Sequence, residues 1–373
     1  MTTGLGSDVQ KLGFGFMRLP MKGEEVDLEL VNKMVDRFIE EGFTYFDTAY
    51  VYGDGVSEHA IRDAVVRRYP REKFTIADKM PMFKVNSNED YQKLFDISLE
   101  RTEAKYFDYY LLHALSNSSF EKAEATGGFE FIAKKKEEGY IKHIGFSFHD
   151  SAEVLDKILT RHPEVEFVQL QLNYADWEND NVQSRLCYET ARKHGVNITV
   201  MEPVKGGTLA KLSDEIEAKF KAVNPDLSIP SWAMRFIGEK DGIITILSGM
   251  NTLEQIEDNM KTLKCVKPLS ELEEQTIKEV VDIFNSAERI PCTACRYCTD
   301  GCPMQINIPR LFSIMNNYTM FGNLEGAKKA YAQATDGHGK ASECLQCGQC
   351  EGVCPQHLPI IENLQKIAAV FEE

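Results

Sequence analysis

The sequence has no apolar run that approaches the roughly 18–20 residues needed to cross a bilayer. Its start, MTTGLGSDVQKLGFG, lacks the basic residues and apolar stretch of a signal peptide, so we expect a soluble, cytoplasmic protein that binds no membrane. Basic charge is also in deficit: 42 Lys and Arg stand against 58 Asp and Glu, a formal net charge of −16. That balance argues against nucleic acid as a partner, because nucleic acid needs a basic face.

Cysteine is scarce over most of the chain. Of the ten cysteines, only Cys187 and Cys265 precede residue 290, and the other eight lie between Cys292 and Cys354. Disulfide frameworks mark short secreted chains, so clustered thiols in a long chain of this kind are better explained as metal ligands. We expect Cys187, on a helical segment, to be a small core residue. Cys265 is assigned no role.

Short apolar runs alternate with segments of helical spacing before residue 265. Residues 27–41 show the helical kind, with Val31, Val35 and Phe38 on one face and Gly42 as a stop. The pattern predicts eight strands, at 13–18, 45–47, 74–77, 109–112, 141–146, 167–172, 196–201 and 243–247. It predicts helices after them, at 27–41, 57–68, 88–104, 128–138, 151–161, 181–194, 230–238 and 252–263.

Eight buried strands, each followed by a helix, favour a (β/α)8 TIM barrel of the α/β class. A doubly wound open sheet is the alternative fold. The chain of 373 residues has room for a barrel of about 250 residues and a further part. We therefore predict a barrel over 1–268, a helical linker over 269–290, and a cysteine-rich domain over 291–373.

Four reactive side chains lie where predicted strands end. Asp47 and Tyr52 follow the second strand, Lys79 follows the third, and His113 follows the fourth. The carboxyl ends of barrel strands meet at one mouth, which is where barrel enzymes carry out their chemistry. We therefore expect the four side chains to converge.

Such a set suits carbonyl reduction. Hydride addition leaves charge on the carbonyl oxygen, so a proton donor must lie close to it. A free phenol, with a pKa of about 10, is a weak acid, and a nearby ammonium should lower that pKa. Lys79 is expected to do this for Tyr52, with Asp47 holding Lys79 and His113 orienting the substrate oxygen.

The motifs Gly13-Phe14-Gly15, FDTAYVYG, LLH and IGFS, together with Lys79, occur in the order and spacing of aldo-keto reductases, and the chain resembles that family over residues 4–265. The resemblance implies that Asp47, Tyr52, Lys79 and His113 form a catalytic tetrad, with Tyr52 as the acid. It implies NADPH as the cofactor. Residues that match the nicotinamide end of the family's cofactor site are Ser147, Gln169 and Asn173; those that match the adenosine phosphate end are Ser248, Gly249, Gln255 and Asn259.

Three departures from the family pattern bear on the cofactor. Phe148 replaces an Asn that often follows the serine, and Met201 stands where an aromatic ring commonly stacks on nicotinamide. Gln255 stands where many members place an Arg on the 2′-phosphate. A flavin such as FMN, or no dinucleotide at all, therefore remains an alternative to NADPH.

Two cysteine runs read C-x2-C-x2-C-x3-C-P, the bacterial ferredoxin pattern, in which the fourth thiolate serves the other cluster. We expect two 4Fe-4S clusters in an α-helical ferredoxin-like domain, with helices at 309–320 and 324–334. One cluster is assigned to Cys292, Cys295, Cys298 and Cys354; the other is assigned to Cys344, Cys347, Cys350 and Cys302. Structural zinc is the alternative, but it usually uses pairs of C-x2-C elements.

Together these features predict an oxidoreductase that reduces a carbonyl or related group on a small molecule, with clusters that exchange electrons with a soluble carrier. One alternative is an electron-transfer protein whose barrel is a docking scaffold or binds flavin. Another is an ordinary NADPH reductase with purely structural clusters. Substrate choice would depend on loops such as 80–90, 114–127 and 203–230.

Overall fold

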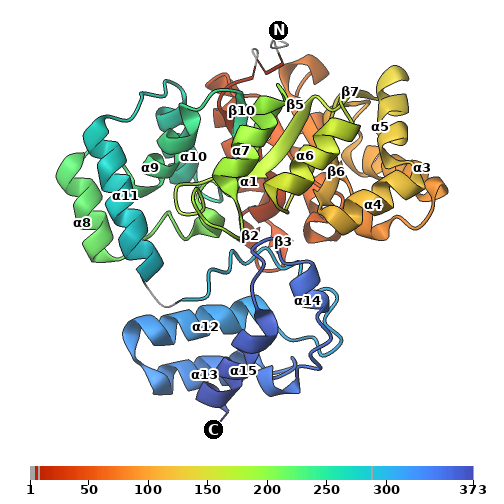
Figure 1. Cartoon of the computed structure of the whole chain (residues 1–373). Coiled ribbons are helices and arrows are strands. Elements are labelled where there is room, and N and C mark those ends of the chain that lie inside the picture. The colour runs from red at the N-terminus through yellow and green to blue at the C-terminus, as the bar shows by residue number, and fades with distance from the viewer. Residues whose placement is uncertain (1–4, 7–8, 287–288, 373) are drawn as a thin grey trace.

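Eight parallel strands close into a barrel in the computed structural model of the chain, which describes residues 5–6, 9–286 and 289–372 (Figure 1). The order around the barrel is β1, β10, β9, β8, β7, β6, β5, β4, and β1 pairs in parallel with β4 to close it. This confirms the predicted TIM barrel and excludes the open sheet. The strands are β1 (Leu12–Gly15), β4 (Tyr45–Asp47), β5 (Thr75–Met80), β6 (Phe107–Leu115), β7 (Ile141–Phe148), β8 (Phe167–Gln171), β9 (Asn197–Met201) and β10 (Ile243–Ser248).

Amphipathic helices cover the outside of the barrel. In α1 the side chains of Val31, Met34, Val35 and Phe38 are buried at helical spacing, and Asp27 caps the helix by accepting from the Leu30 N–H at 3.1 Å. The helices before residue 287 are α1 (Leu28–Glu40), α2 (Val56–Ile61), α3 (Asn88–Thr102), α4 (Asn117–Thr126), α5 (Gly128–Glu137), α6 (Ala152–Arg161), α7 (Ser184–Lys193), α8 (Asp214–Val223), α9 (Ile229–Gly238), α10 (Leu253–Leu263) and α11 (Glu271–Ser286).

The structure corrects several predicted elements. The first strand ends at Gly15, and a 3-10 turn over Phe16–Arg18 follows it. The helix predicted at 57–68 divides into α2 and a π-helical turn over Arg62–Val66. A two-stranded hairpin of β2 (Met21–Lys22) and β3 (Glu25–Val26) was not predicted. Helices α4 and α8 lie within the expected loops 114–127 and 203–230.

The end of the barrel at which the strands begin is filled by aromatic side chains. Tyr45, Tyr109 and Phe167 lie within the barrel, and the rings of Tyr45 and Tyr109 are 5.1 Å apart. Close strand packing depends on Gly145, because a Cβ there would lie 2.3 Å from the Phe167 carbonyl oxygen. A filled strand-start end leaves the opposite, carboxyl end for chemistry.

The helix expected to link the two domains is packed against the barrel's outer layer. In α11, Ile277, Val280 and Phe284 are buried in a cluster with Phe220 of α8 and Trp232 of α9. Positions 287–288 of the predicted linker lie outside the described residues.

A second body, residues 289–372, lies below the barrel in the view of Figure 1. We call it the cysteine module. Its apolar core includes Leu311, Phe312, Ile360, Leu364 and Ile367. Its helices are α12 (Ile308–Phe321), α13 (Leu324–Ala334), α14 (Gln349–Gly352) and α15 (Ile360–Phe371). The predicted helices at 309–320 and 324–334 are confirmed.

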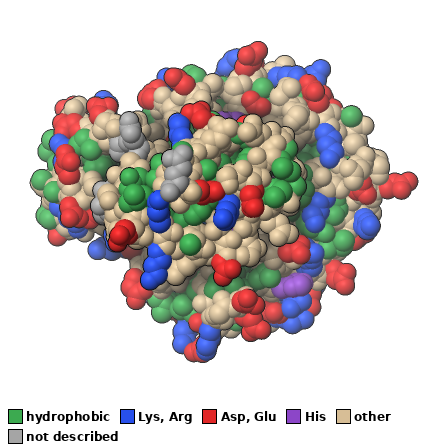
Figure 2. All heavy atoms as spheres, turned by 90° about the horizontal axis from the view of Figure 1, so that it is seen from below, with side chains coloured by type: hydrophobic (Ala, Val, Ile, Leu, Met, Phe, Trp, Pro, Cys, Tyr) green, Lys and Arg blue, Asp and Glu red, His purple; other side chains and the backbone are tan. Residues whose placement is uncertain are grey.

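The face seen from the module side carries acidic and basic side chains interspersed with apolar ones (Figure 2). No field of one sign dominates that view, although the chain's net charge is −16. Among the described helices, none combines the length and apolar character that a membrane crossing requires.

Candidate active site and cluster cavities

Strand register brings three of the four predicted acid–base residues to one side of the barrel interior. Asp47 of β4 pairs with Ala77 of β5, and Lys79 is two residues beyond Ala77. Lys79 in turn pairs with Leu111 of β6, and His113 is two residues beyond Leu111. Because side chains alternate along a strand, each step of two keeps the same face. Asp47, Lys79 and His113 therefore rise in succession towards the barrel mouth.

Lys79 and Asp47 form a buried ion pair. The Lys79 Nζ donates to Asp47 Oδ1 at 2.6 Å and to the Thr48 carbonyl oxygen at 2.6 Å. Lys79 is 0% exposed and Asp47 is 4% exposed. Burial raises the pKa of the Asp47 carboxyl, and the charge and hydrogen bond of Lys79 oppose that rise. The pair holds the ammonium fixed beneath the mouth.

Tyr52 completes the set from the 3-10 turn Tyr52–Gly55, which follows β4. Its ring centroid lies 4.9 Å from Lys79 Nζ and 5.9 Å from the His113 ring. Burial raises the pKa of Tyr52 well above the usual value, and the Asp47 charge adds to that rise. The net lowering of this pKa that was expected from Lys79 is wrong, because burial outweighs any favourable effect of the nearby ammonium.

His113 is held as a neutral imidazole. Burial, then the charge of Lys79, lowers its pKa well below the usual value. Its Nδ1 has no hydrogen-bond partner among the described residues, and its Nε2 lies 3.3 Å from the hydroxyl of Tyr297. A neutral imidazole at this point can donate to an oxygen in the mouth without carrying charge.

Tyr297 belongs to the cysteine module and was missed by the sequence reasoning. Its hydroxyl also hydrogen-bonds Tyr52, so it touches two members of the predicted acid–base set. It lies between Cys295 and Cys298 in the motif, and the spacing of the cysteines does not indicate that its side chain points towards the barrel. The contact with His113 spans 184 positions along the chain.

Other hydrogen bonds also join the module to the barrel near its mouth. Arg18 donates to the Thr293 carbonyl oxygen at 2.8 Å. Gly206 lets that carbonyl approach, since a Cβ at Gly206 would lie 2.5 Å from it. A second contact joins Gln356 of the module to Gln171 of β8, and the two side-chain amides exchange hydrogen bonds with donor–acceptor distances of 2.8 and 3.2 Å.

A buried ion pair lies beneath the Gln356 contact. Lys205 pairs with Asp176, and its Nζ also donates to Gln356 Oε1 at 3.2 Å. Gln171 Nε2 donates to Asp176 at 2.9 Å. Barrel and module therefore share one buried polar network, which fixes the module on the mouth.

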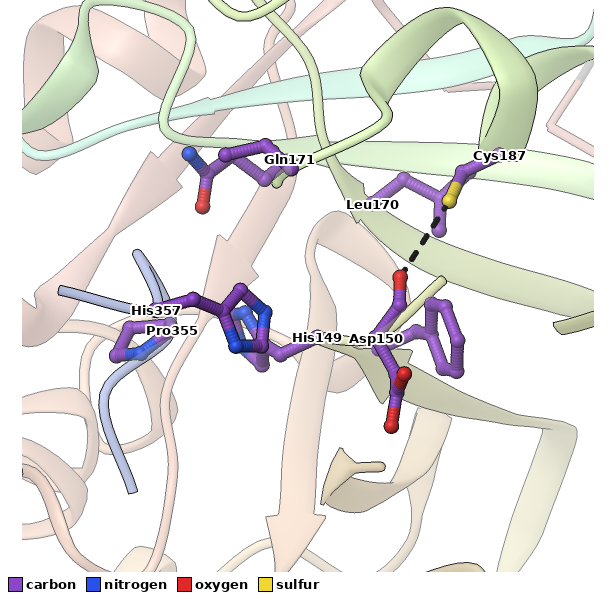
Figure 3. Close-up of a pocket in the computed structure, with 9 residues that line it drawn as sticks. His149, Asp150, Leu170, Gln171, Cys187, Pro355 and His357 are labelled. Atoms are coloured by element: carbon purple, nitrogen blue, oxygen red, sulfur yellow. Dashed lines mark hydrogen bonds between the residues drawn. The ribbon is translucent and has the colours of Figure 1, made fainter. Parts of the chain in front are cut away.

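A small cavity of about 280 Å³ opens where the module meets β7 and β8 (Figure 3). His149 and His357 lie close together on one side of it, and Cys187 is on the other, with its Sγ 3.7 Å from the Asp150 carbonyl oxygen. Burial, then His357, lowers the pKa of His149 to about 4. Cys187 is 4% exposed within the core, and burial raises its thiol pKa, so it is a core residue, as predicted.

The residues matched to the nicotinamide end of the cofactor site lie at or near the carboxyl ends of the barrel strands. One of them carries a hydrogen-bond acceptor that is not paired with any described residue. Ser147 Oγ accepts from the Ala114 N–H at 2.7 Å. Asn173 Nδ2 donates to Asp176 at 2.8 Å. Gln169 Oε1 is buried and has no hydrogen-bond partner within the part of the chain that the structure describes. A buried amide oxygen without a partner fits a site that receives a ligand's N–H group, such as a carboxamide.

The residues matched to the phosphate end gather at the start of α10. Asn259 donates to Ser248 Oγ at 3.1 Å, and Gln255 Oε1 accepts from the Asn251 N–H at 2.8 Å. Gly249 lies against Arg18, because a Cβ on Gly249 would be 3.3 Å from the Arg18 Cβ. The aliphatic part of the Arg18 side chain therefore lies beside this segment, while its guanidinium donates to the Thr293 carbonyl oxygen of the cysteine module, and the sequence reasoning missed this residue.

The eight clustered cysteines surround two cavities. A cavity of about 320 Å³ is lined by Cys292, Cys295, Cys298 and Cys354, and one of about 350 Å³ by Cys302, Cys344, Cys347 and Cys350. This is the crosswise grouping predicted from spacing. Among the described residues, no three His, Cys, Asp or Glu side chains converge on a single-ion position. Thiols spaced around a cavity fit a cubane better than one zinc ion.

The comparisons with known proteins agree with this architecture. Residues 11–282 match the Aldo/keto reductase family, and residues 291–358 match the 4Fe-4S dicluster domain. An uncharacterized oxidoreductase of Schizosaccharomyces pombe is 26% identical over 68% of this chain and 81% of its own length. A probable aldo-keto reductase of Glycine max is 29% identical over 54% of this chain and 58% of its own.

Solved structures show the same fold. An aldo-keto reductase of Bacillus halodurans in its holo form superposes with a TM-score of 0.57 at 23% identity, covering 73% of this chain and 92% of that one. An aldo/keto reductase of Klebsiella pneumoniae in complex with NADP and acetate has the same TM-score at 20% identity and the same coverages. The chain thus belongs to the aldo/keto reductase family and carries a C-terminal 4Fe-4S dicluster domain.

Proposed function

We propose that this oxidoreductase reduces the carbonyl group of a small molecule with NADPH, using Tyr52 as the proton donor. The observation that carries the proposal is the buried cluster of Tyr52, His113 and the Lys79–Asp47 pair at the carboxyl ends of the barrel strands. A structural role alone would not require four polar groups in an enclosed mouth, where each is costly to bury.

The roles of the residues follow from their positions. Tyr52 gives its hydroxyl proton to the carbonyl oxygen, and His113 orients that oxygen through Nε2. The resulting Tyr52 phenolate is stabilised by the Lys79 ammonium, 4.9 Å from the ring centroid. Asp47 keeps Lys79 in place. Bound NADPH would supply the hydride.

Three features of the barrel support NADPH. The free Gln169 Oε1 would accept from the carboxamide of the nicotinamide. The start of α10, capped by Thr252 and carrying Gln255, would face the adenosine phosphates with its N-terminal amides. Ser147 and Asn173 match the family's positions at the nicotinamide end, and Ser248, Gly249 and Asn259 match those at the phosphate end. An NADP complex of the Klebsiella pneumoniae relative agrees with this choice. FMN remains the alternative cofactor.

The cysteine module would hold two 4Fe-4S clusters, which carry single electrons. We name the near cavity (Cys292, Cys295, Cys298 and Cys354) and the far cavity (Cys302, Cys344, Cys347 and Cys350) by their distance from the barrel. The far cavity is the open one, since Cys347 is exposed and Leu345 is 63% exposed. A one-electron carrier protein would therefore exchange electrons there.

Substitution of Tyr52 tests the proton donor. Tyr52→Phe should lower the kcat for NADPH-dependent reduction of benzaldehyde on the order of a thousandfold, because the general acid is lost. Tyr50→Phe makes the same chemical change two residues earlier and should leave kcat within twofold. Wild-type turnover by Tyr52→Phe would refute the assignment.

A second function is favoured by the module that covers the mouth. If Tyr297 and Gln356 never leave the barrel, the chain is an electron carrier with a scaffold barrel. Anaerobic purification followed by an absorbance spectrum separates the two. The enzyme shows iron–sulfur absorbance and consumes NADPH with an aldehyde; the carrier shows the absorbance alone, and a bound flavin would add its own bands.

A further inference from the structure

Among the described residues of the cysteine module, Tyr297 is the one whose side chain hydrogen-bonds the acid–base set. Its hydroxyl lies 3.3 Å from His113 Nε2 and shares a hydrogen bond with the Tyr52 hydroxyl. The His113 and Tyr297 rings meet edge to face, with centroids 6.1 Å apart. One oxygen therefore links the proposed proton donor and the proposed orienting group.

The carbonyl oxygen of a substrate needs the same two contacts. It must accept from Tyr52 to be protonated and from His113 to be oriented, and both donors converge on one point. Two oxygens cannot share that point, because hydrogen-bonded oxygens keep about 2.7 Å between them. The Tyr297 hydroxyl occupies the position that the substrate oxygen would take.

The segment that carries Tyr297 also lines the near cavity. We call residues 292–298 the near loop; Cys292, Cys295 and Cys298 are its thiols. Ala294 and Arg296 have φ angles of +53° and +68°, in the left-handed region, which tightens the loop. A displacement of Tyr297 would therefore move backbone that is bonded to the cavity's thiols.

We propose that Tyr297 occupies the subsite of the substrate's carbonyl oxygen, and that a substrate binds by displacing it and so shifts the near loop. The subsite rests on the proposed function, because Tyr52 and His113 define it. Tyr297 is thus a specificity-determining residue. Only a compound with a strongly accepting oxygen restores both hydrogen bonds, whereas an alkene would leave two buried donors unpaired.

Steady-state kinetics with benzaldehyde and NADPH test the competition. Tyr297→Phe removes the competing hydroxyl and keeps the ring, so KM should fall about tenfold, the effect of one to two neutral hydrogen bonds. The kcat should stay within twofold, because Tyr52 is intact. Tyr318→Phe, the same change on α12 away from the barrel, should alter neither value.

A spectroscopic readout tests the link to the near loop without turnover. In photoreduced holoprotein without NADPH, benzaldehyde should shift the EPR signal of one cluster in the wild type. In Tyr297→Phe the shift should persist at about tenfold lower benzaldehyde concentration. In Tyr297→Ala no side chain needs to be displaced, and the shift should vanish.

The outcomes separate the two proposals. An unchanged or raised KM in Tyr297→Phe, with no EPR shift in the wild type, would overturn the role of Tyr297. Absence of NADPH turnover with the EPR shift present would overturn only the proposed reaction. If Tyr297→Ala loses iron, the proposal is tested by the benzaldehyde concentration at which the EPR shift appears in Tyr297→Phe and in the wild type.

Discussion

At the scale of single residues, the Lys79–Asp47 pair is the feature on which the site depends. Both side chains are enclosed, and the ammonium keeps two short contacts, to Asp47 and to the Thr48 carbonyl. A buried pair of this kind contributes little net stability, but removing one partner leaves a charge without compensation. In the proposed reaction the same pair would position the charge that stabilises a Tyr52 phenolate.

Asp47→Asn should therefore weaken both the fold and the reaction. We expect the free energy of unfolding to fall by about 3 kcal/mol, because the Lys79 ammonium stays buried with only the Thr48 carbonyl as an acceptor. Urea denaturation measures this loss. Asp54→Asn, an exposed site seven positions along, is the matched control and should change stability by less than about 0.5 kcal/mol. Equal effects at both sites would contradict the importance of the pair.

The pH dependence of the reaction follows from two shifted groups. The raised pKa of Tyr52 keeps the phenol protonated beyond its usual value of about 10, so the acid form persists as the pH rises. The lowered pKa of His113 keeps the imidazole neutral below its usual value of about 6.5. We expect kcat/KM for benzaldehyde to be flat from about pH 6 to about pH 9. An inflection near pH 6.5 that Tyr52→Phe leaves in place would contradict this.

At the scale of elements, α9 and α11 are joined by a paired charge. Arg235 donates to both oxygens of Glu273, at 2.6 and 3.0 Å, and both side chains are 9% exposed. The Arg235 hydrogen bond holds the pKa of Glu273 at about 2. A carboxyl with a lowered pKa contributes stability above its unfolded pKa, about 4.5, and loses it as the pH falls towards 2.

Glu273→Gln should lower the free energy of unfolding by about 2 kcal/mol at neutral pH, since the Arg235 guanidinium loses its charged partner. The difference from the wild type should shrink as the pH falls from about 4.5 towards 2, because the unfolded wild-type carboxyl takes up a proton in that range while the native one, with its lowered pKa, stays ionised. Urea titrations at several pH values measure it. Glu274→Gln, the exposed neighbour, serves as control. A difference that is independent of pH would show that charge is not the cause.

The eight barrel strands could be predicted because each is a short apolar run between helical segments. The elements that the sequence analysis missed have weaker signals. Helix α4 is short and begins with Asn-Ser-Ser, which resembles a loop, although Ser116 and Ser119 form a capping box. The β2–β3 hairpin has two residues per strand, too few for a period to be seen.

The residues of the site divide in the same way. Asp47, Tyr52, Lys79 and His113 were predicted because the barrel topology fixes where strand ends meet. Tyr297 and Arg18 were not, because their positions depend on how the module docks on the barrel. Contacts across such an interface leave no period in the sequence, and docking is set by shape and by buried networks such as that of Gln356.

At the scale of the whole molecule, the two bodies have separate cores that meet at the mouth. The barrel's core contains only Cys187 among the cysteines, whereas thiols contribute heavily to the module's core. Cys298 belongs to that core, and Cys292, Cys302, Cys344, Cys350 and Cys354 pack against it. The fold of the module should therefore depend on its clusters, and that of the barrel should not.

Removal of the clusters by ferricyanide and a chelator should unfold the module and leave the barrel intact. Hydrogen exchange followed by mass spectrometry should show α12 to α15 losing protection, while the barrel strands keep it. Release of the near loop would free Tyr52 and His113, so the KM for benzaldehyde should fall at least as far as it does in Tyr297→Phe, and kcat should persist. Cys187→Ser, a thiol outside the module, is the control and should leave both clusters in place. If the barrel strands lost protection together with the module, the clusters would be supporting the fold of the whole chain. The two cores would then not be independent in stability, and the barrel could not be expected to work without the clusters.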